Sequence, residues 1–332
     1  MAYAMTYSPY PTYSPLQVGI DLEWAALCLE QGLLVGIPTE TVYGLAGNAY
    51  NMAAVLSIFA AKRRPYNDPL IVHTDRLERV LTFAREMPPA AHALAAAFWP
   101  GPLTLLLPRT YLIPDLITAG LDTVAVRIPN HPLTLQLLAR LNFPVAAPSA
   151  NPFGYISPTT PAHVLAQLKQ SVSYVLDGGP CAVGIESTII GFDGQSPIIH
   201  RLGGLSIEQI VAVVGRVTMA HAPTEQIFAP GTLSSHYAPT TPLVLGPPQP
   251  AAIEEQYRVG VLSLQTVYPG IPAQNQKLLS PAGNLWEAAH NLYAALREMD
   301  GWGLQVIYAE LMPQNGIGAA INDRLSRAAA PH

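Results

Sequence analysis

Apolar residues recur along this chain in short runs, most of them the length of a buried β-strand. In the first two thirds of the sequence these runs occupy residues 32–39, 70–73, 103–107, 123–129, 144–150, 174–179, 187–192 and 197–203. Between them, apolar residues return every three or four positions, as in amphipathic helices, at residues 21–31, 52–61, 90–98 and 132–141. Strand-like and helix-like segments that alternate in this way predict an α/β domain with a mixed sheet.

The pattern changes after the helix predicted to begin at Ser206. Residues 218–241 are rich in Pro, Thr and Ser, which is the composition of a linker. A second, smaller α/β unit follows, with strands predicted at residues 258–264 and 304–311 and a helix at 284–299. We therefore expect four parts, which are a mobile tail at 1–15, an N-terminal domain at 16–217, the linker at 218–241 and a C-terminal domain at 242–332.

Composition narrows the class of protein. The 332 residues are 50% hydrophobic, which is enough for two buried cores. A formal net charge of -5 argues against a protein whose whole surface binds nucleic acid, so any basic site must be local. The two cysteines, Cys28 and Cys181, fit neither a disulfide framework nor a zinc site and favour a reducing cytoplasm. We find no secretory signal and no apolar run of the ~18 residues that a membrane span needs.

Three adjacent cations, Lys62, Arg63 and Arg64, stand out in a chain with only 12% charged residues. Neighbouring cations repel one another unless water or an anion relieves them. One interpretation is an anion-binding site. The other is an exposed helix end, since cations interact favourably with the C-terminus of a helix such as residues 52–61.

Polar residues also follow two of the predicted strands. Residues 37–45 place Thr39, Glu40 and Thr41 directly after a buried strand, where open α/β sheets bind their ligands. Residues 146–154 combine Ser149 and Asn151 with small residues, whose exposed backbone N–H groups can hold phosphate or carboxylate oxygens. Each segment is a candidate binding loop, although either could be an ordinary turn.

Further candidates lie on or beside apolar strands. Arg127 interrupts an apolar run, so it either pairs with an internal acid or awaits an anionic substrate. Arg201 ends a strand before two glycines, a good setting for phosphate, and Glu186 and Ser187 precede another strand. His73 is equally well explained as a core histidine or as a functional one.

Several catalytic signatures are missing from the sequence. We find no P-loop, no GxSxG nucleophile elbow and no HExxH or other metal-ligand spacing. Metal ligands are therefore unknown at this stage, and covalent nucleophilic catalysis has no convincing candidate residue.

Taken together, these segments resemble the threonylcarbamoyl-AMP synthase family in its long, two-domain form. The resemblance rests on PTETVYGL at Pro38, KRRP and PLIVH within residues 62–73, WPGPLTLLL at Trp99, VAVRIPNHP at Val124, APSAN at Ala147, SPT at Ser157, GIESTI at Gly184 and RLGG at Arg201. APGTLSSHYAP at Ala229 and GIGAAINDRLSRAA at Gly316 are similar to the family's linker and to the end of its C-terminal domain. The implied fold is a YrdC-like twisted mixed sheet with helices, followed by a smaller Rossmann-like α/β domain.

The resemblance also implies a reaction. A nucleotidyltransferase of this family joins L-threonine, bicarbonate and ATP, with a divalent ion expected to be Mg²⁺, into threonylcarbamoyl-adenylate and pyrophosphate. Downstream threonylcarbamoyl transferase proteins then modify an adenosine of certain tRNAs. A triphosphate needs positive charge around it, which would explain the cation cluster as a phosphate cradle.

The family's motifs assign roles to individual residues. The implied catalytic cations are Lys62 and Arg64. The implied ATP-binding residues are Arg64, Asp68, Thr123, Ser149, Asn151, Ser157, Arg201 and Tyr237, with Asp68 standing where the family often has Asn. The implied threonine-binding residues are Thr41, His73, Arg127, Ala147 and Ser187. The linker is expected to close over the cleft as a lid.

Two other readings of the sequence remain open. One is a non-catalytic RNA-binding module, with weak affinity for tRNA, although net acidity and the lack of interleaved aromatic and basic residues weigh against it. The other is carbamoyl-adenylate chemistry with another substrate, such as carbamoyl phosphate, as in hydrogenase-maturation proteins. Those proteins carry zinc-type cysteines that this chain lacks.

Overall fold

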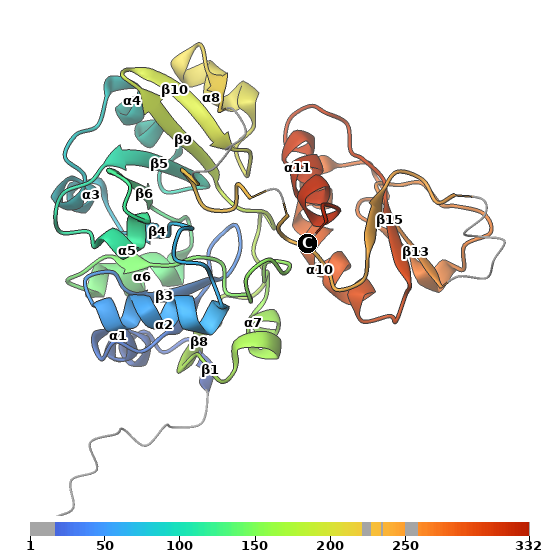
Figure 1. Cartoon of the computed structure of the whole chain (residues 1–332), viewed down its shortest axis with the longest axis horizontal. Coiled ribbons are helices and arrows are strands. Elements are labelled where there is room, and N and C mark those ends of the chain that lie inside the picture. The colour runs from blue at the N-terminus through green and yellow to red at the C-terminus, as the bar shows by residue number, and fades with distance from the viewer. Residues whose placement is uncertain (1–16, 221–226, 234, 250–257, 332) are drawn as a thin grey trace, which may run out of the picture.

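The computed structural model describes residues 17–220, 227–233, 235–249 and 258–331, which form two α/β domains (Figure 1). The predicted fold class, a large twisted mixed sheet with helices and a smaller second domain, is confirmed. The tail expected at residues 1–15 lies outside the described residues.

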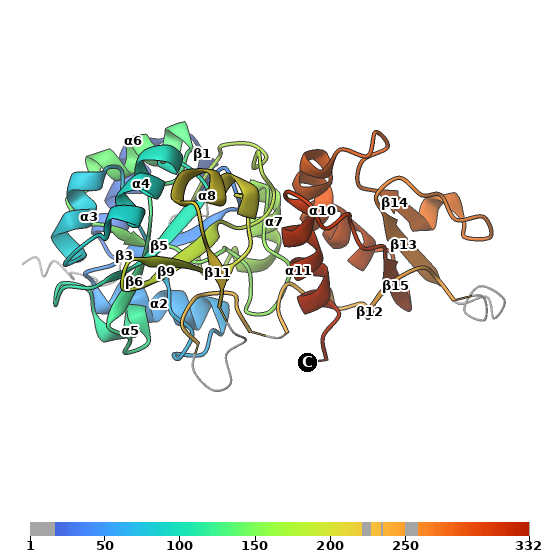
Figure 2. The same ribbon diagram turned by 90° about the horizontal axis from the view of Figure 1, so that it is seen from above.

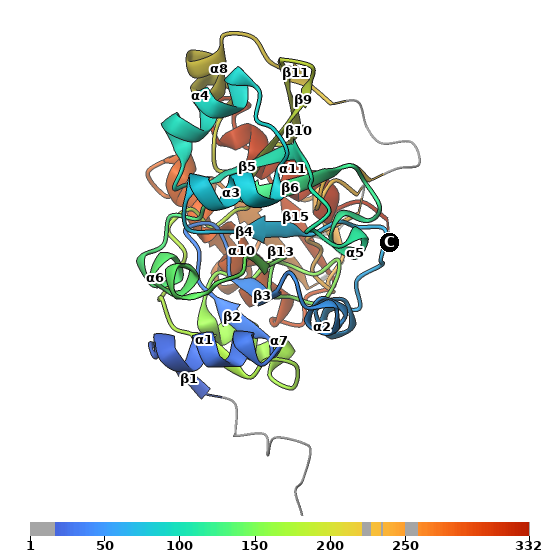
Figure 3. The same ribbon diagram turned by 90° about the vertical axis from the view of Figure 1, so that its left-hand side faces the viewer.

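The N-terminal domain is organised around one mixed sheet of eleven strands. Their spatial order is β1-β8-β2-β3-β7-β4-β6-β5-β9-β10-β11, and Figure 3 shows it running from β1 at the bottom to β10 and β11 at the top. The strands are β1 (Gln17–Gly19), β2 (Val35–Ile37), β3 (Gly44–Asn48), β4 (Ile71–His73), β5 (Leu103–Pro108), β6 (Thr123–Arg127), β7 (Val145–Ala146), β8 (Tyr174–Leu176), β9 (Thr188–Asp193), β10 (Ser196–Arg201) and β11 (Thr218–Met219).

Helices connect and cover these strands. They are α1 (Leu22–Glu30), α2 (Met52–Lys62), α3 (Leu77–Phe83), α4 (Pro89–Phe98), α5 (Asp115–Thr118), α6 (Pro132–Arg140), α7 (Pro161–Leu168) and α8 (Ile207–Val214). Side chains fix several of their starts: Asn51 caps α2, Thr160 caps α7 with a proline next to it, and Ser206 forms a capping box with Gln209.

The predicted elements are present, but the sequence pattern missed several others. One missed strand is β3. It begins inside the loop predicted at residues 37–45, and its sequence GLAGN is poor in the residues that favour strands. Its pairing with β2 and β7 on either side makes it a strand, with Val35 opposite Ala46 and Asn48 opposite Val145. Neighbouring strands can therefore decide an element that its own residues do not.

The C-terminal domain has a parallel four-stranded sheet in the order β12-β15-β13-β14. Its elements are β12 (Leu243–Leu245), β13 (Val259–Ser263), the 3-10 helix η1 (Ala273–Asn275), β14 (Gln276–Leu278), α10 (Leu285–Asp300), β15 (Val306–Ala309) and α11 (Gly318–Ala328). Seen from above in Figure 2, α10 and α11 lie between this sheet and the N-terminal domain. In the described part of the chain, no helix has the length and apolar character to cross a membrane.

The two domains share a hydrophobic core. Val42, Ile156, Ile185 and Tyr237 from the N-terminal domain and the linker belong to the same buried cluster as the apolar faces of α10 and α11. Because these residues are buried among C-terminal side chains, the second domain is packed firmly against the loops that Val42 and Ile185 belong to.

Candidate active site

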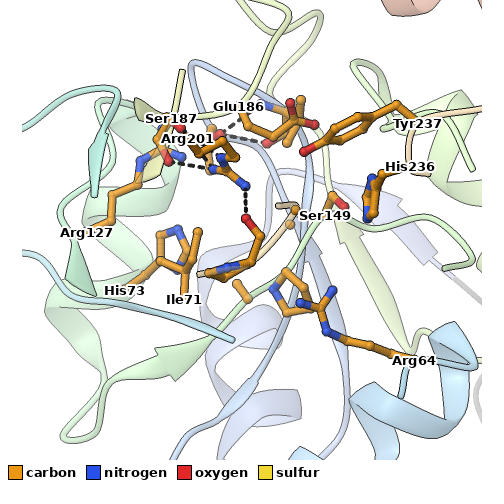
Figure 4. Close-up of a pocket in the computed structure, with 17 residues that line it drawn as sticks. Arg64, Ile71, His73, Arg127, Ser149, Glu186, Ser187, Arg201, His236 and Tyr237 are labelled. Carbon is orange, nitrogen blue, oxygen red and sulfur yellow. Dashed lines mark hydrogen bonds between the residues drawn. The ribbon is translucent and has the colours of Figure 1, made fainter. Parts of the chain in front are cut away.

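A small cavity of about 50 Å³ lies where strand-end loops of the N-terminal domain meet the linker (Figure 4). Of the residues predicted to bind substrates, those that line it are Arg64, His73, Arg127, Ala147, Ser149, Ser187, Arg201 and Tyr237. The linker contributes Pro230, Gly231 and His236 as well. Residues more than 170 positions apart in the sequence thus surround one hollow that contains three arginines.

The three adjacent cations have different environments. Arg63 is exposed and adopts a left-handed backbone (φ 54°) that ends α2, while Lys62 and Arg64 on either side of it are buried. The Lys62 Nζ donates hydrogen bonds of 2.6 Å to the backbone oxygens of both Ser149 and Asn151. Burial, with the Arg64 charge adding to it, holds the pKa of Lys62 well below its ordinary value. Lys62 does not line the cavity; it holds the loop that carries Ser149.

Arg64 reaches the cavity with an acid beside it. Its Nη2 lies 2.8 Å from Asp68 Oδ1, and its guanidinium donates to the backbone oxygens of Asp68 (3.1 Å) and Pro69 (2.7 Å). Burial raises the pKa of the fully buried Asp68, against the opposing effect of the Arg64 charge. Asp68 is not among the lining residues, so in this structure it acts on the site through Arg64.

Arg127 pairs with an internal acid, which is one of the two alternatives raised by the sequence, and it also lines the cavity. Its Nη2 lies 2.7 Å from Glu40 Oε1, and its Nη1 donates to Thr41 Oγ1 at 2.9 Å. The parallel pairing of β4 with β6 places His73 directly beside Arg127, and Figure 4 shows both on the same side of the cavity. Burial, helped by the Arg127 charge, lowers the pKa of His73 to about 3, so its imidazole is neutral near pH 7.

Arg201 donates hydrogen bonds to neutral oxygens. Its Nε and Nη2 donate to the Ser187 backbone oxygen (3.2 and 3.0 Å), Nη2 also donates to Ser187 Oγ (3.2 Å), and Nη1 donates to Pro230 O (2.9 Å). Across the described ranges no carboxylate forms an ion pair with it. Arg201 therefore joins β10 to the linker while its positive charge has no paired acid.

Glu186 is a site residue to which the sequence assigned no definite role. Its Oε1 accepts a 2.6 Å hydrogen bond from Ser157, and its Oε2 accepts from Tyr293 (2.8 Å) and Arg324 (2.7 Å). Burial alone would raise the pKa of Glu186, but the charges of Arg324 and then Arg201 outweigh it and lower that pKa. Ser157 does not line the cavity itself; it contacts the site through this carboxylate.

Tyr237 closes the cavity from the linker side. It is a non-glycine residue with a left-handed backbone (φ 64°), a conformation that side chains disfavour unless packing enforces it. The Arg324 guanidinium lies 4.9 Å from its ring centroid, and the Tyr293 ring stacks on it at 5.8 Å. Its buried hydroxyl makes no hydrogen bond within the part of the chain that the structure describes.

A second, larger cavity of about 670 Å³ lies close by, lined by Thr123, Leu106, His200 and Phe228 among others. Leu106 shares a small buried apolar cluster with Ile71, which lines the first cavity, and with Ala229 of the linker. The two cavities are therefore neighbours separated by these side chains. Thr123 borders only the second one.

The remaining predicted residues lie behind the walls of these cavities. Thr41 bonds Arg127, and Asn151 uses its side-chain nitrogen to bond the backbone oxygens of Pro152 and Tyr155, at 2.8 Å each. Like Lys62, Asp68 and Ser157, they support residues that face the hollow.

No preformed metal cluster is found. Among the described residues, no group of three or more His, Cys, Asp and Glu side chains is placed to hold an ion. A Mg²⁺ ion that accompanies ATP takes many of its ligands from phosphate oxygens and water, so it fits a site with few protein ligands.

The chain is similar to known proteins over most of its length. Residues 28–203 match a family model described as "Telomere recombination", and residues 205–330 match one described as "Threonylcarbamoyl-AMP synthase, C-terminal domain". A threonylcarbamoyl-AMP synthase of Pyrococcus abyssi is 39% identical over 92% of this chain and 94% of its own length. One of Bacillus subtilis is 39% identical over 92% of each chain. The crystal structure of P. abyssi Sua5 complexed with L-threonine superposes with a TM-score of 0.88 at 38% identity, covering 95% of this chain and 98% of that one.

Proposed function

The chain belongs to the threonylcarbamoyl-AMP synthase family. We propose which parts of its two cavities bind the substrates L-threonine, bicarbonate and ATP. The enzyme is a nucleotidyltransferase that makes the adenylate used in tRNA modification. The observation that carries the assignment is the single cavity lined by Arg64, Arg127 and Arg201, because both ATP and an amino acid carboxylate are anions.

The threonine subsite is assigned to the side of Arg127 and His73, with the Ala147 backbone and Ser187 beside them. The contacts of Arg127 with Gly101 O, Thr41 and Glu40 occupy its three nitrogens once each. A guanidinium has five N–H donors, so donors are left for a carboxylate. The P. abyssi relative was crystallised as a complex with L-threonine, which supports threonine as a substrate of this chain.

The phosphates are assigned to the side of Arg64, Ser149 and Arg201, and the nucleoside to the neighbouring cavity lined by Thr123. Positive charge there would stabilise the departing pyrophosphate. A cavity of about 50 Å³ holds one or two waters, not a triphosphate. Binding therefore requires the linker residues over the cavity, Pro230, Gly231, His236 and Tyr237, to move. Closure afterwards would keep water from the labile adenylate.

The proposed reaction proceeds without a covalent enzyme intermediate. The threonine amine forms a C–N bond with CO₂ and loses a proton, or with bicarbonate and releases water, which gives an N-carboxylate. An oxygen of this N-carboxylate attacks the α-phosphorus in line, and the bond from that phosphorus to pyrophosphate breaks. Positioning and electrostatics supply the catalysis. Mg²⁺ would neutralise phosphate charge. Asp68, which pairs with Arg64, is the acid that could help to hold it there. The product would pass in the cytoplasm to a tRNA threonylcarbamoyl transferase, with bicarbonate as the carbon source.

Pyrophosphate release, measured with ATP and bicarbonate, tests this function. We expect release with threonine, slower release with serine by about 10- to 200-fold for one missing methyl group, and background release without amino acid. Absence of threonine-dependent release overturns the proposal. Salt-sensitive tRNA binding in place of that release would favour the RNA-binding alternative.

A further inference from the structure

A buried carboxylate joins the C-terminal domain to the wall of the first cavity. Glu186 lines that cavity and is only 6% exposed. Two of its three hydrogen-bond donors come from the second domain, the Tyr293 hydroxyl of α10 at 2.8 Å and the Arg324 Nε of α11 at 2.7 Å. The C-terminal helices therefore determine how this acid is held.

Arg324 contacts two further parts of the site. Its Nη2 donates a 2.7 Å hydrogen bond to the backbone oxygen of Leu202, the residue after Arg201, and its guanidinium packs on the ring of Tyr237. The side chain is 1% exposed, so it is fully desolvated. One C-terminal residue thus touches the Glu186 loop, the loop after β10 and the linker.

Packing keeps the Glu186 loop close to α10. Gly184 has a left-handed backbone (φ 84°), and a Cβ there would lie 2.5 Å from the Ala289 backbone oxygen. Only glycine permits this approach. The contact of the two domains is therefore built into the backbone next to Glu186, and does not depend on the Arg324 side chain alone.

The charges explain what this arrangement achieves. Among the described residues Arg201 has only neutral hydrogen-bond partners, and its charge and that of Arg324 both act on Glu186. Without the Arg324 charge, the buried Glu186 would lose its ion-pair partner, and Arg201 is the other cation whose charge acts on it. An unpaired carboxylate would also repel an incoming triphosphate.

We propose that the C-terminal domain completes the ATP site. Arg324 and Tyr293 are positioning residues that hold and neutralise Glu186, and this keeps Arg201 available for phosphate oxygens. The inference rests on the proposed function, because it takes Arg201 to be a phosphate ligand.

A matched pair of tyrosine variants tests the proposal in the full chain. Tyr293→Phe removes one hydrogen bond to Glu186 and keeps the ring that stacks on Tyr237. Tyr155→Phe removes a link of the same type that does not involve Glu186, the tyrosine–carboxylate hydrogen bond between the domains from Tyr155 to Asp300 Oδ2 at 2.7 Å. In pyrophosphate release, Tyr293→Phe should raise the KM for ATP about 3- to 10-fold, and Tyr155→Phe by less than about twofold. The KM for threonine should change little in either variant.

Arg324→Met provides the test of charge. It should raise the KM for ATP by about tenfold or more, since it leaves a buried carboxylate unpaired. Adding Glu186→Gln should then lower that KM again, because the unpaired charge is gone, whereas a purely structural role for Arg324 gives no such rescue. If Arg324→Met does not fold, the two tyrosine variants still decide the question.

The outcomes separate this inference from the proposed function. An unchanged KM for ATP in Tyr293→Phe, equal effects of the two tyrosine variants, or no rescue by Glu186→Gln overturns the role of the C-terminal domain. A wild-type protein that releases no pyrophosphate overturns the proposed function itself.

Discussion

The buried Lys62 offers a test of whether the cation cluster works by supporting a loop or by contacting phosphate. Its side chain is 1% exposed and its Nζ donates to two backbone oxygens of the loop that carries Ser149. Lys62→Met keeps the length of the side chain and removes both hydrogen bonds. If Lys62 is a catalytic cation, this variant should lower kcat. If Lys62 supports the loop, the variant should lower stability and raise the KM for ATP.

The expected size of the effect follows from those two bonds. Each buried carbonyl left without a partner costs about 1–3 kcal/mol, and relief of the buried ammonium offsets part of the sum. We expect the free energy of unfolding to fall by about 2–4 kcal/mol. Since Ser149 would no longer be held, the KM for ATP should rise by about tenfold, a change equivalent to about 1.4 kcal/mol.

Urea unfolding followed by circular dichroism measures the stability, and pyrophosphate release at varied ATP concentration measures the KM. The matched control is Arg63→Met, which removes the exposed neighbouring cation and should change the unfolding free energy by no more than about 0.5 kcal/mol. If Lys62→Met is as stable as the wild type and loses only kcat, Lys62 acts directly on the substrates and the support role is refuted.

Two further predictions concern buried ionisable groups. Asp68→Asn should lower the unfolding free energy by about 3 kcal/mol or more, because Arg64 loses its buried ion pair, and urea unfolding measures this change. The same variant should lower the KM for ATP in pyrophosphate release, because the Arg64 charge is then uncompensated. An unchanged KM would contradict this second expectation. For His73 the pKa is about 3 in the fold and 6.5 when unfolded, so below pH 6.5 the unfolded chain binds more protons and stability falls with falling pH. The unfolding free energy of the wild type relative to His73→Gln should therefore drop by about 1.4 kcal/mol per pH unit in that window, and parallel pH profiles would contradict it.

Sequence reasoning identified many of the strands and the loops that follow them, because buried strands form apolar runs and ligand loops follow strand ends. It also recognised that Arg127 needed an acid or an anionic ligand. It could not show that Glu40 is that acid, because this depends on how the loop after β2 packs against β6. Nor could it show that His73 lies beside Arg127, which depends on the pairing of β4 with β6. The roles of these residues in substrate binding stay predictions.

The residues whose roles were missed are those that act across the two domains. Tyr293 and Arg324 read as ordinary members of C-terminal helices, and their partner Glu186 lies 107 and 138 positions away. No local pattern marks such a contact, because hydrogen-bond partners far apart in sequence are set only by how the elements pack.

The sequence by itself determined the strands and helices that have a clear apolar pattern, and which loops carry charge, because hydrophobic periodicity and backbone preferences act over a few residues. Only the tertiary structure decided which cations are paired, which face the cavity and which support a neighbouring loop. The three adjacent cations show the difference: one left-handed residue at Arg63 turns Lys62 and Arg64 inward and leaves Arg63 in solvent. Burial and pairing are properties of the packed chain, and they set the electrostatics on which the proposed chemistry depends.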